Sequence, residues 1–211
     1  FFLFMFKKLP LGLLLISPFS VLAHPHAFID MQTKPLVKDN QLIGFSTQWL
    51  LDEASSSAVL YDVKQAKGDK AAQQKLVDEV MANVVNEHYF SYVFDKENHK
   101  IKYTKHPENY GMRVKGNEVE YYFDFLLAQT QALQNNEFTL MTYDRTYYVA
   151  MRYAETGKRA VDFSSLPANC KGEVLEPNVD EKIQSYASSL DKSQKNEDDS
   201  LGVLFAQKVK I

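Results

Sequence analysis

The 211-residue sequence carries 24 Lys and Arg against 27 Asp and Glu, for a formal charge of −3, and 45% of its residues are hydrophobic. A chain of this length and composition can form one domain with a sizeable core. No basic block follows Lys8, which argues against a surface for nucleic acid or anionic lipid. Cys170 is the only cysteine, so it has no internal disulfide partner and is expected to be a buried or tolerated thiol.

Residues 1–23 have the pattern of a secretory signal peptide. Met5 is the expected start, a lysine pair and a short apolar run follow, and small residues end at Ala23. The apolar run is too short to span a bilayer, and no later run is long enough. We expect cleavage after Ala23, leaving residues 24–211 as a single domain with a charge of −5 in an oxidising compartment, most simply a bacterial periplasm.

This cleavage would make His24 the first residue, so that its free α-amine and its imidazole could chelate one metal ion. His26 would supply a third nitrogen. Such a nitrogen set suits copper, nickel or zinc, and raw affinity favours copper over the other two. Pro25 has no amide hydrogen, so the square-planar mode that uses the second residue's deprotonated amide is excluded, and the fold must supply further ligands. The alternative is that His-Pro-His is an overhang without a specific ligand.

The hydrophobic pattern predicts an α+β fold, with antiparallel β-sheet packed against one long and one or two short helices in a single domain. A β-hairpin of residues 26–37 and 41–51 comes first, followed by a short helix to about residue 66. Asp69 caps the long helix, whose apolar spacing continues into Phe90, Val93 and Phe94. The remaining expected elements are strands at 100–105, 110–115, 118–128, 137–143, 146–154, 159–163, 172–176 and 203–210, a helix at about 179–190, and a polar loop at 191–200.

The hairpin brings acidic residues towards the histidines. Asp30 lies four residues after His26 and projects from the same face of a strand. Asp52 and Glu53 end the second strand, and the start of one hairpin strand neighbours the end of the other. The sequence therefore places His26 and Asp30 within reach of Asp52 or Glu53. The alternative role of the Asp52-Glu53 pair is a helix N-cap with first-turn charge.

Asp144 lies in the aromatic stretch Tyr143–Tyr148, which is expected to be a hairpin turn between two strands and could face a site. His88 lies on the apolar stripe of the long helix and is expected in the core or at its boundary. His99 and His106 fall in turn-like stretches and are expected to be solvated. No His-x-x-x-His or Cys-x-x-Cys pair exists, which excludes an autonomous zinc module.

Four stretches carry a family resemblance: Pro25–Asp30, Trp49 with Asp52 and Glu53, Tyr143–Tyr148, and Leu201–Ala206. On these stretches the chain resembles a bacterial family of exported proteins of unknown function, marked by a His-Pro-His-x-Phe-Ile-Asp motif. Its members are often labelled as the periplasmic component of an uncharacterised ABC-type transport system. Family members tend to be encoded beside nickel/cobalt-type exporters or metal ABC importers, so the resemblance implies periplasmic handling of a divalent transition metal with a membrane transporter as partner.

Two features differ from this family pattern. Many relatives carry an acidic, calcium-loop-like insert where residues 62–68 of this chain have lysine and alanine at the ligand spacings, so calcium is not expected there. Relatives also often carry a second cysteine that could pair with the one matching Cys170.

The sequence thus predicts a periplasmic accessory protein that binds nickel, cobalt, zinc or copper and serves a membrane metal transporter of the ABC or nickel/cobalt-exporter type. One alternative is an oxidative enzyme with a copper brace at His24. Another is a metal-free module that docks on a transporter. The expected metal ligands are His24 and His26, with Asp30, Asp52, Glu53 and Asp144 as further candidates.

Overall fold

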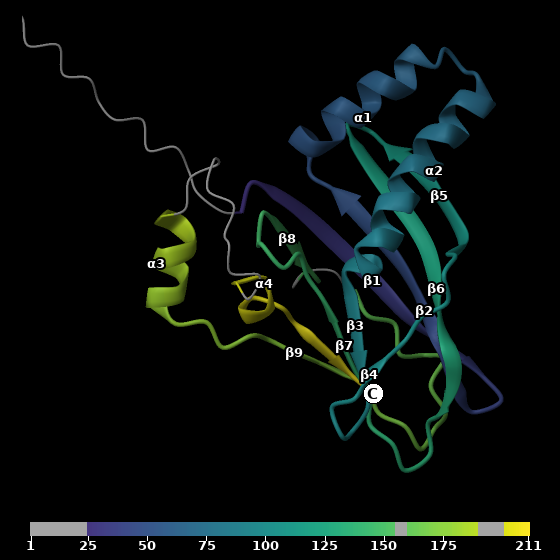
Figure 1. The fold of residues 1–211 in the computed structure, drawn as a ribbon, viewed down its shortest axis with the longest axis vertical. Helices are drawn as coiled ribbons and strands as arrows, with labels where there is room; N and C mark the ends of the chain where they lie inside the picture. Colours follow the sequence, from purple (N-terminus) through teal and green to yellow (C-terminus); the bar gives the residue numbers. More distant parts are fainter. Residues whose placement is uncertain (1–24, 155–159, 190–200) are drawn as a thin grey trace, which may run out of the picture.

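The computed structural model describes residues 25–154, 160–189 and 201–211 (Figure 1). The expected signal peptide, His24 and the polar loop at 191–200 lie outside these residues. The described parts contain two five-stranded sheets and a few helices in a single domain, which confirms the α+β prediction.

The first sheet has the strand order β5-β6-β2-β1-β8. The predicted hairpin is confirmed as β1 paired with β2, and Asp39 and Asn40 turn the chain with φ of 51° and 58°. The predicted turn at Gly116 joins β5 to β6. The β1–β8 pair is parallel, while the other pairs of this sheet are antiparallel. The strands are β1 (Ala27–Lys38), β2 (Gln41–Leu51), β5 (Glu108–Lys115), β6 (Glu118–Ala132) and β8 (Val149–Arg152).

The second sheet has the strand order β4-β3-β7-β10-β9 and is antiparallel throughout. The strand predicted at 203–210 is only partly right, because α4 (Leu201–Leu204) precedes a shorter strand. The expected strand at 159–163 is reduced in its described part to a single parallel bridge between Thr33 and Val161. The strands are β3 (Ser91–Phe94), β4 (Lys100–Ile101), β7 (Thr139–Thr142), β9 (Glu173–Leu175) and β10 (Lys208–Lys210).

The expected hairpin turn at Tyr143–Tyr148 is wrong, because the two strands that it joins belong to different sheets. β7 pairs with β3 and β10, whereas β8 pairs with β1. The turn is instead a crossing between the sheets, and it delivers β8 alongside the start of β1.

Two predicted helices, α1 (Glu53–Gln65) and α2 (Lys70–Asn86), lie side by side against β6 and β5 (Figure 1). Asp52 and Asp69 accept backbone N–H groups as their N-caps. The helix α3 (Glu181–Ser189) confirms the helix expected at about 179–190, and its Ala187 packs against Leu201 of α4. No helix in the described residues is long and apolar enough to cross a membrane.

The prediction that the long helix continues into Phe90, Val93 and Phe94 is wrong. α2 ends at Asn86, and a single 3₁₀ turn, η1 (His88–Phe90), leads into β3. The three residues of η1 have φ of 52°, 58° and 49°, so the backbone is left-handed there and cannot continue the right-handed α2. His88 is exposed, which corrects the expectation that it lies in the core or at its boundary.

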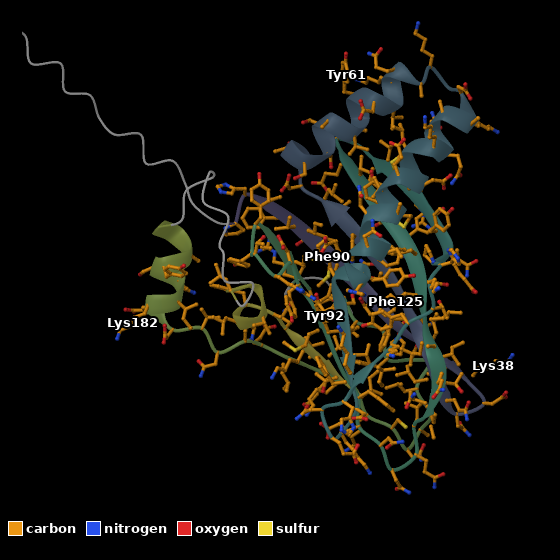
Figure 2. The ribbon with its side chains drawn as sticks, in the orientation of Figure 1. Lys38, Tyr61, Phe90, Tyr92, Phe125 and Lys182 are labelled. Atoms are coloured by element: carbon orange, nitrogen blue, oxygen red, sulfur yellow. The ribbon has the colours of Figure 1, made fainter. Side chains whose placement is uncertain are left out.

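The main core is aromatic and lies between the sheets. Tyr89 is 2% exposed, and its ring stacks on Phe123 and Phe125 with centroids 5.8 Å and 5.2 Å away. Trp49 meets Phe90 edge-on at 6.0 Å. Figure 2 shows Phe90 and Phe125 in the densely filled centre. Such aromatic pairs add about 0.5–1.5 kcal/mol each beyond the area that they bury.

Candidate functional site

The start of β1 is fixed on both sides by its neighbours. The backbone N–H groups of His26 and Ala27 both donate to the Tyr148 carbonyl, at 2.8 Å and 3.3 Å. On the other side, Phe28 donates to an Asp52 carboxylate oxygen at 2.7 Å, and Asp52 donates its own N–H back to the Phe28 carbonyl at 3.1 Å. The chain is therefore held in one place from His26 onward.

The His26 imidazole is half-buried and packs on the Tyr148 ring, with centroids 5.0 Å apart and planes tilted by 51°. A ring held in this way loses less freedom on binding a metal than one on an untethered tail, because its rotamer is already restricted. Phe28 and Tyr148, which flank this histidine, are 42% and 45% exposed. The site thus combines a positioned imidazole with exposed aromatic surface.

Asp52 lies where the hairpin argument expects it, and it also has the alternative role of helix cap. One carboxylate oxygen accepts the Ser55 N–H at 2.6 Å and the other accepts the Phe28 N–H. Burial alone raises the pKa of the Asp52 carboxyl, but the hydrogen bonds from Ser55 and Phe28 outweigh it and leave the pKa below its usual value. Asp52 is therefore an ionised group that ties β1 to α1, while the neighbouring Glu53 is exposed in the first turn.

Asp144 organises the crossing between the sheets. Its carboxylate accepts hydrogen bonds from the Thr146 backbone, the Thr146 hydroxyl and the Val149 N–H, at 3.0–3.1 Å. Gly202 packs directly on this turn, where an added Cβ would lie 1.7 Å from the Asp144 carbonyl oxygen. Asp144 thus places Tyr148 beside His26 by shaping the backbone.

Asp30 lies further along β1, opposite Arg152 of β8. The Arg152 Nε donates to Asp30 at 3.1 Å, and both side chains are about half exposed. The Arg152 guanidinium also lies 5.8 Å from the centre of the Phe28 ring. Together with Tyr147 and Phe205, these residues line an open groove of about 440 Å³.

The fold gathers His26, Asp30, Asp52 and Asp144 around β1, although not as a preformed cage. Among the described residues, the only group of three or more potential ligands with atoms within 4.8 Å of one another is Asp95, Glu97 and His99. That group lies in an exposed turn, where Asp95 accepts the backbone N–H groups of the other two. His99 and His106 are exposed, as expected. The described residues around His26 therefore do not form such a group by themselves, and His24 lies outside the described residues.

Sequence reasoning did not identify Tyr148 or Arg152 as neighbours of the site. Both contacts depend on the parallel pairing of β1 with β8, two strands more than 110 residues apart in the chain. No local pattern specifies such a pairing. The aromatic stretch around Asp144 was the one available signal, and it pointed to a hairpin.

Cys170 is a free, partly exposed thiol.

Comparisons with known proteins give a family without an assigned activity. The family model described as "Protein of unknown function (DUF1007)" matches residues 9–211. An "Uncharacterized protein" of Haemophilus influenzae is 64% identical over 205 residues, which covers 97% of this chain and 98% of that protein. No solved structure matches the chain.

Proposed function

We propose that this chain, which belongs to the DUF1007 family, is a periplasmic accessory protein that binds a divalent transition metal and serves a membrane metal transporter. The observation that carries the proposal is the fixed position of His26. Its backbone N–H is bonded to Tyr148 and its ring packs on the same residue. His26 is therefore held by the domain and is not part of an untethered overhang.

The proposed ligands are the α-amine and imidazole of His24 together with the imidazole of His26. Cleavage after Ala23 creates the amine, and Pro25 prevents the backbone amide from competing for the metal. Two imidazoles and an amine favour nickel, zinc, cobalt or copper over hard cations. A neutral imidazole is the ligand, so binding weakens as the pH falls through the range where histidine protonates, about pH 6.5.

The nearby carboxylates have different availability. Asp52 and Asp144 already accept backbone hydrogen bonds that hold the strand and the turn in place. Glu53 is exposed, and Asp30 is shared only with the exposed Arg152. We therefore assign Glu53 and Asp30 as the carboxylates able to join or attract the metal, while Asp52 and Asp144 position the histidine.

A second candidate function is a metal-free module that docks on the transporter. The exposed rings of Phe28 and Tyr148 favour it, because clustered exposed aromatic side chains are typical of contact surfaces. In that case His-Pro-His is incidental, and changing the histidines leaves transporter binding intact.

The decisive experiment begins with the mass of the exported protein, followed by calorimetric titration with nickel, zinc, cobalt and copper. A mature mass that starts at His24 is expected. Replacing a residue that only supports a metal ligand typically lowers metal affinity by about 10–100-fold. His24→Ala and His26→Ala each remove a ligand, so each should lower the affinity by more than this. A mature chain that starts elsewhere, or unchanged affinity in both variants, would overturn the proposal.

Two matched controls isolate the chelate. One extra glycine placed before His24 keeps both imidazoles but moves the amine, and it should weaken binding like His24→Ala. His106→Ala removes an exposed histidine far from β1 in sequence, and it should leave the affinity unchanged.

A further inference from the structure

A cleft of about 640 Å³ lies away from the His26 site. It is formed by the end of α2, the turn η1 and the segment 100–105. This segment links the two sheets, because Ile101 pairs with β3 and Tyr103 bridges to Leu127 of β6. The volume lies within the range of roughly 300–1,000 Å³ that is typical of small-molecule sites.

The floor of the cleft is mainly apolar. It includes Val85, Ile101 and the rings of Tyr89 and Tyr103. Both phenols are satisfied by backbone carbonyls: Tyr103 donates to Ser91, and Tyr89 donates to Thr104. Burial raises the pKa of Tyr89 to about 12, so this phenol stays neutral near pH 7. Because Tyr89 is only 2% exposed, the open surface of the floor comes from Val85, Ile101 and Tyr103, and it carries no charge.

The rim of the cleft is cationic. Lys100, Lys102 and Lys105 all contribute to the lining, together with the His88 imidazole. All four side chains belong to exposed residues. None of the described lining residues is an Asp or Glu. In a chain whose net charge is −3, this surface is locally positive.

The wall of the cleft also contains strained backbone. His88, Tyr89 and Phe90 all have positive φ, and each such residue costs about 1–2 kcal/mol relative to a right-handed conformation. Backbone strain of this kind occurs preferentially at binding sites. The strained turn directs the Tyr89 ring into the core and leaves His88 at the rim.

From the apolar floor and the cationic rim, we propose that this cleft binds a small amphipathic carboxylate, with its apolar tail on the floor and its carboxylate at the lysines. The charge of the rim selects an anion, and the uncharged floor selects a tail without further polar groups. The site is separate from His26 and does not depend on the proposed metal function.

The test is calorimetric titration of the metal-free full chain with sodium decanoate, and with decyltrimethylammonium as a cationic ligand that has the same tail. Saturable binding of decanoate, weakened by added salt, and much weaker binding of the cation are expected. Replacing Lys100, Lys102 and Lys105 together by Gln should weaken decanoate binding by about tenfold, because each exposed ion pair contributes less than about 1 kcal/mol. Val85→Phe should fill the cleft and weaken the binding of both ligands.

The matched control replaces Lys38, Lys64 and Lys75 by Gln, which changes the net charge equally at exposed positions outside the cleft. It should bind decanoate like the wild type. Thermal unfolding of every variant checks that the fold is intact. The absence of saturable decanoate binding by the wild-type chain would overturn the proposal. The lysines would then be assigned to preventing the β4 edge from pairing with a strand of another chain. Equal binding of the cation, or a control as weak as the rim variant, would also overturn it.

Discussion

The turn at Tyr89 and the start of β1 at His26 are both held in unusual positions, but by different forces. Tyr89 is 2% exposed, and stacked aromatic rings hold it in a left-handed conformation. His26 is half-buried at the side of the first sheet, where backbone and carboxylate hydrogen bonds position its strand. Apolar burial offsets backbone strain in the first region, whereas polar contacts set the geometry of the second.

This difference has a functional consequence. A buried aromatic cluster is insensitive to pH near neutrality and tolerates little change in volume. A strand end held by the ionised Asp52 carboxylate can keep a histidine near solvent, but its geometry depends on the charge of that carboxylate. The proposed metal site therefore lies in the region that small chemical changes can adjust without unfolding the protein.

The largest effect is expected for Tyr89→Ala in the core. Removing this ring leaves a cavity beside Phe123 and Phe125 and should lower the free energy of unfolding by about 3–5 kcal/mol. Urea denaturation measures the loss. Tyr61→Ala, at a position that is 63% exposed, should change it by less than about 0.5 kcal/mol. Similar values for the two variants would contradict the assigned role of the core ring.

Gly202→Ala tests the crossing that positions Tyr148. The new Cβ would lie 1.7 Å from the Asp144 carbonyl, so α4 or the turn must move. We expect a loss of about 1–3 kcal/mol in unfolding free energy and weaker metal binding. Gly68→Ala, where an added Cβ meets nothing within 4 Å, is a control for the glycine replacement itself, although its φ of 78° adds some strain. Unchanged metal affinity in Gly202→Ala would show that the Asp144 turn does not affect metal binding at His26.

Asp52→Ala tests the polar side of the comparison. It removes the cap of α1 and the partner of the Phe28 N–H, and should cost about 1–2 kcal/mol at pH 7. Because the pKa of Asp52 is lowered in the folded state, its ionisation stabilises the protein above about pH 4, and this contribution is lost as the pH falls further.

Unfolding of wild type, Asp52→Ala and Asp52→Asn should be compared at pH 7 and pH 3. Asn keeps a capping oxygen without the charge, so its variant should be the least destabilised at pH 7. The difference between wild type and Asp52→Asn should shrink at pH 3. A difference that stays constant would show that the charge of Asp52 contributes nothing.

The smallest effect is expected for the double variant Glu97→Gln and His99→Ala. It removes two of the three groups of the exposed turn, while Asp95 stays in place to shape it. Stability should change by less than about 0.5 kcal/mol, and calorimetric metal affinity should stay at the wild-type value. A large loss of metal affinity would move the proposed site from β1 to this turn.

Local patterns predicted much of the fold correctly. The β1–β2 hairpin followed from two apolar strands around Lys38–Asn40, and the α2 cap followed from Asp69. The proximity of Asp52 to the start of β1 also followed, because adjacent antiparallel strands have a fixed register. The apolar spacing through Phe90 led to a wrong prediction of a longer helix, because the same spacing fits a helix or a buried turn followed by a strand.

The sequence by itself determined the elements whose contacts are local: the hairpin, the capped helices and the acidic pair at the end of β2. Only the tertiary structure decided which residues surround His26. Hydrogen bonds to Asp144 shape the turn that crosses from one sheet to the other. The parallel pairing of β8 with β1 then places Tyr148 and Arg152 beside β1. Such a contact depends on the packing of strands more than 110 residues apart, and periodicity within a short window carries no information about it.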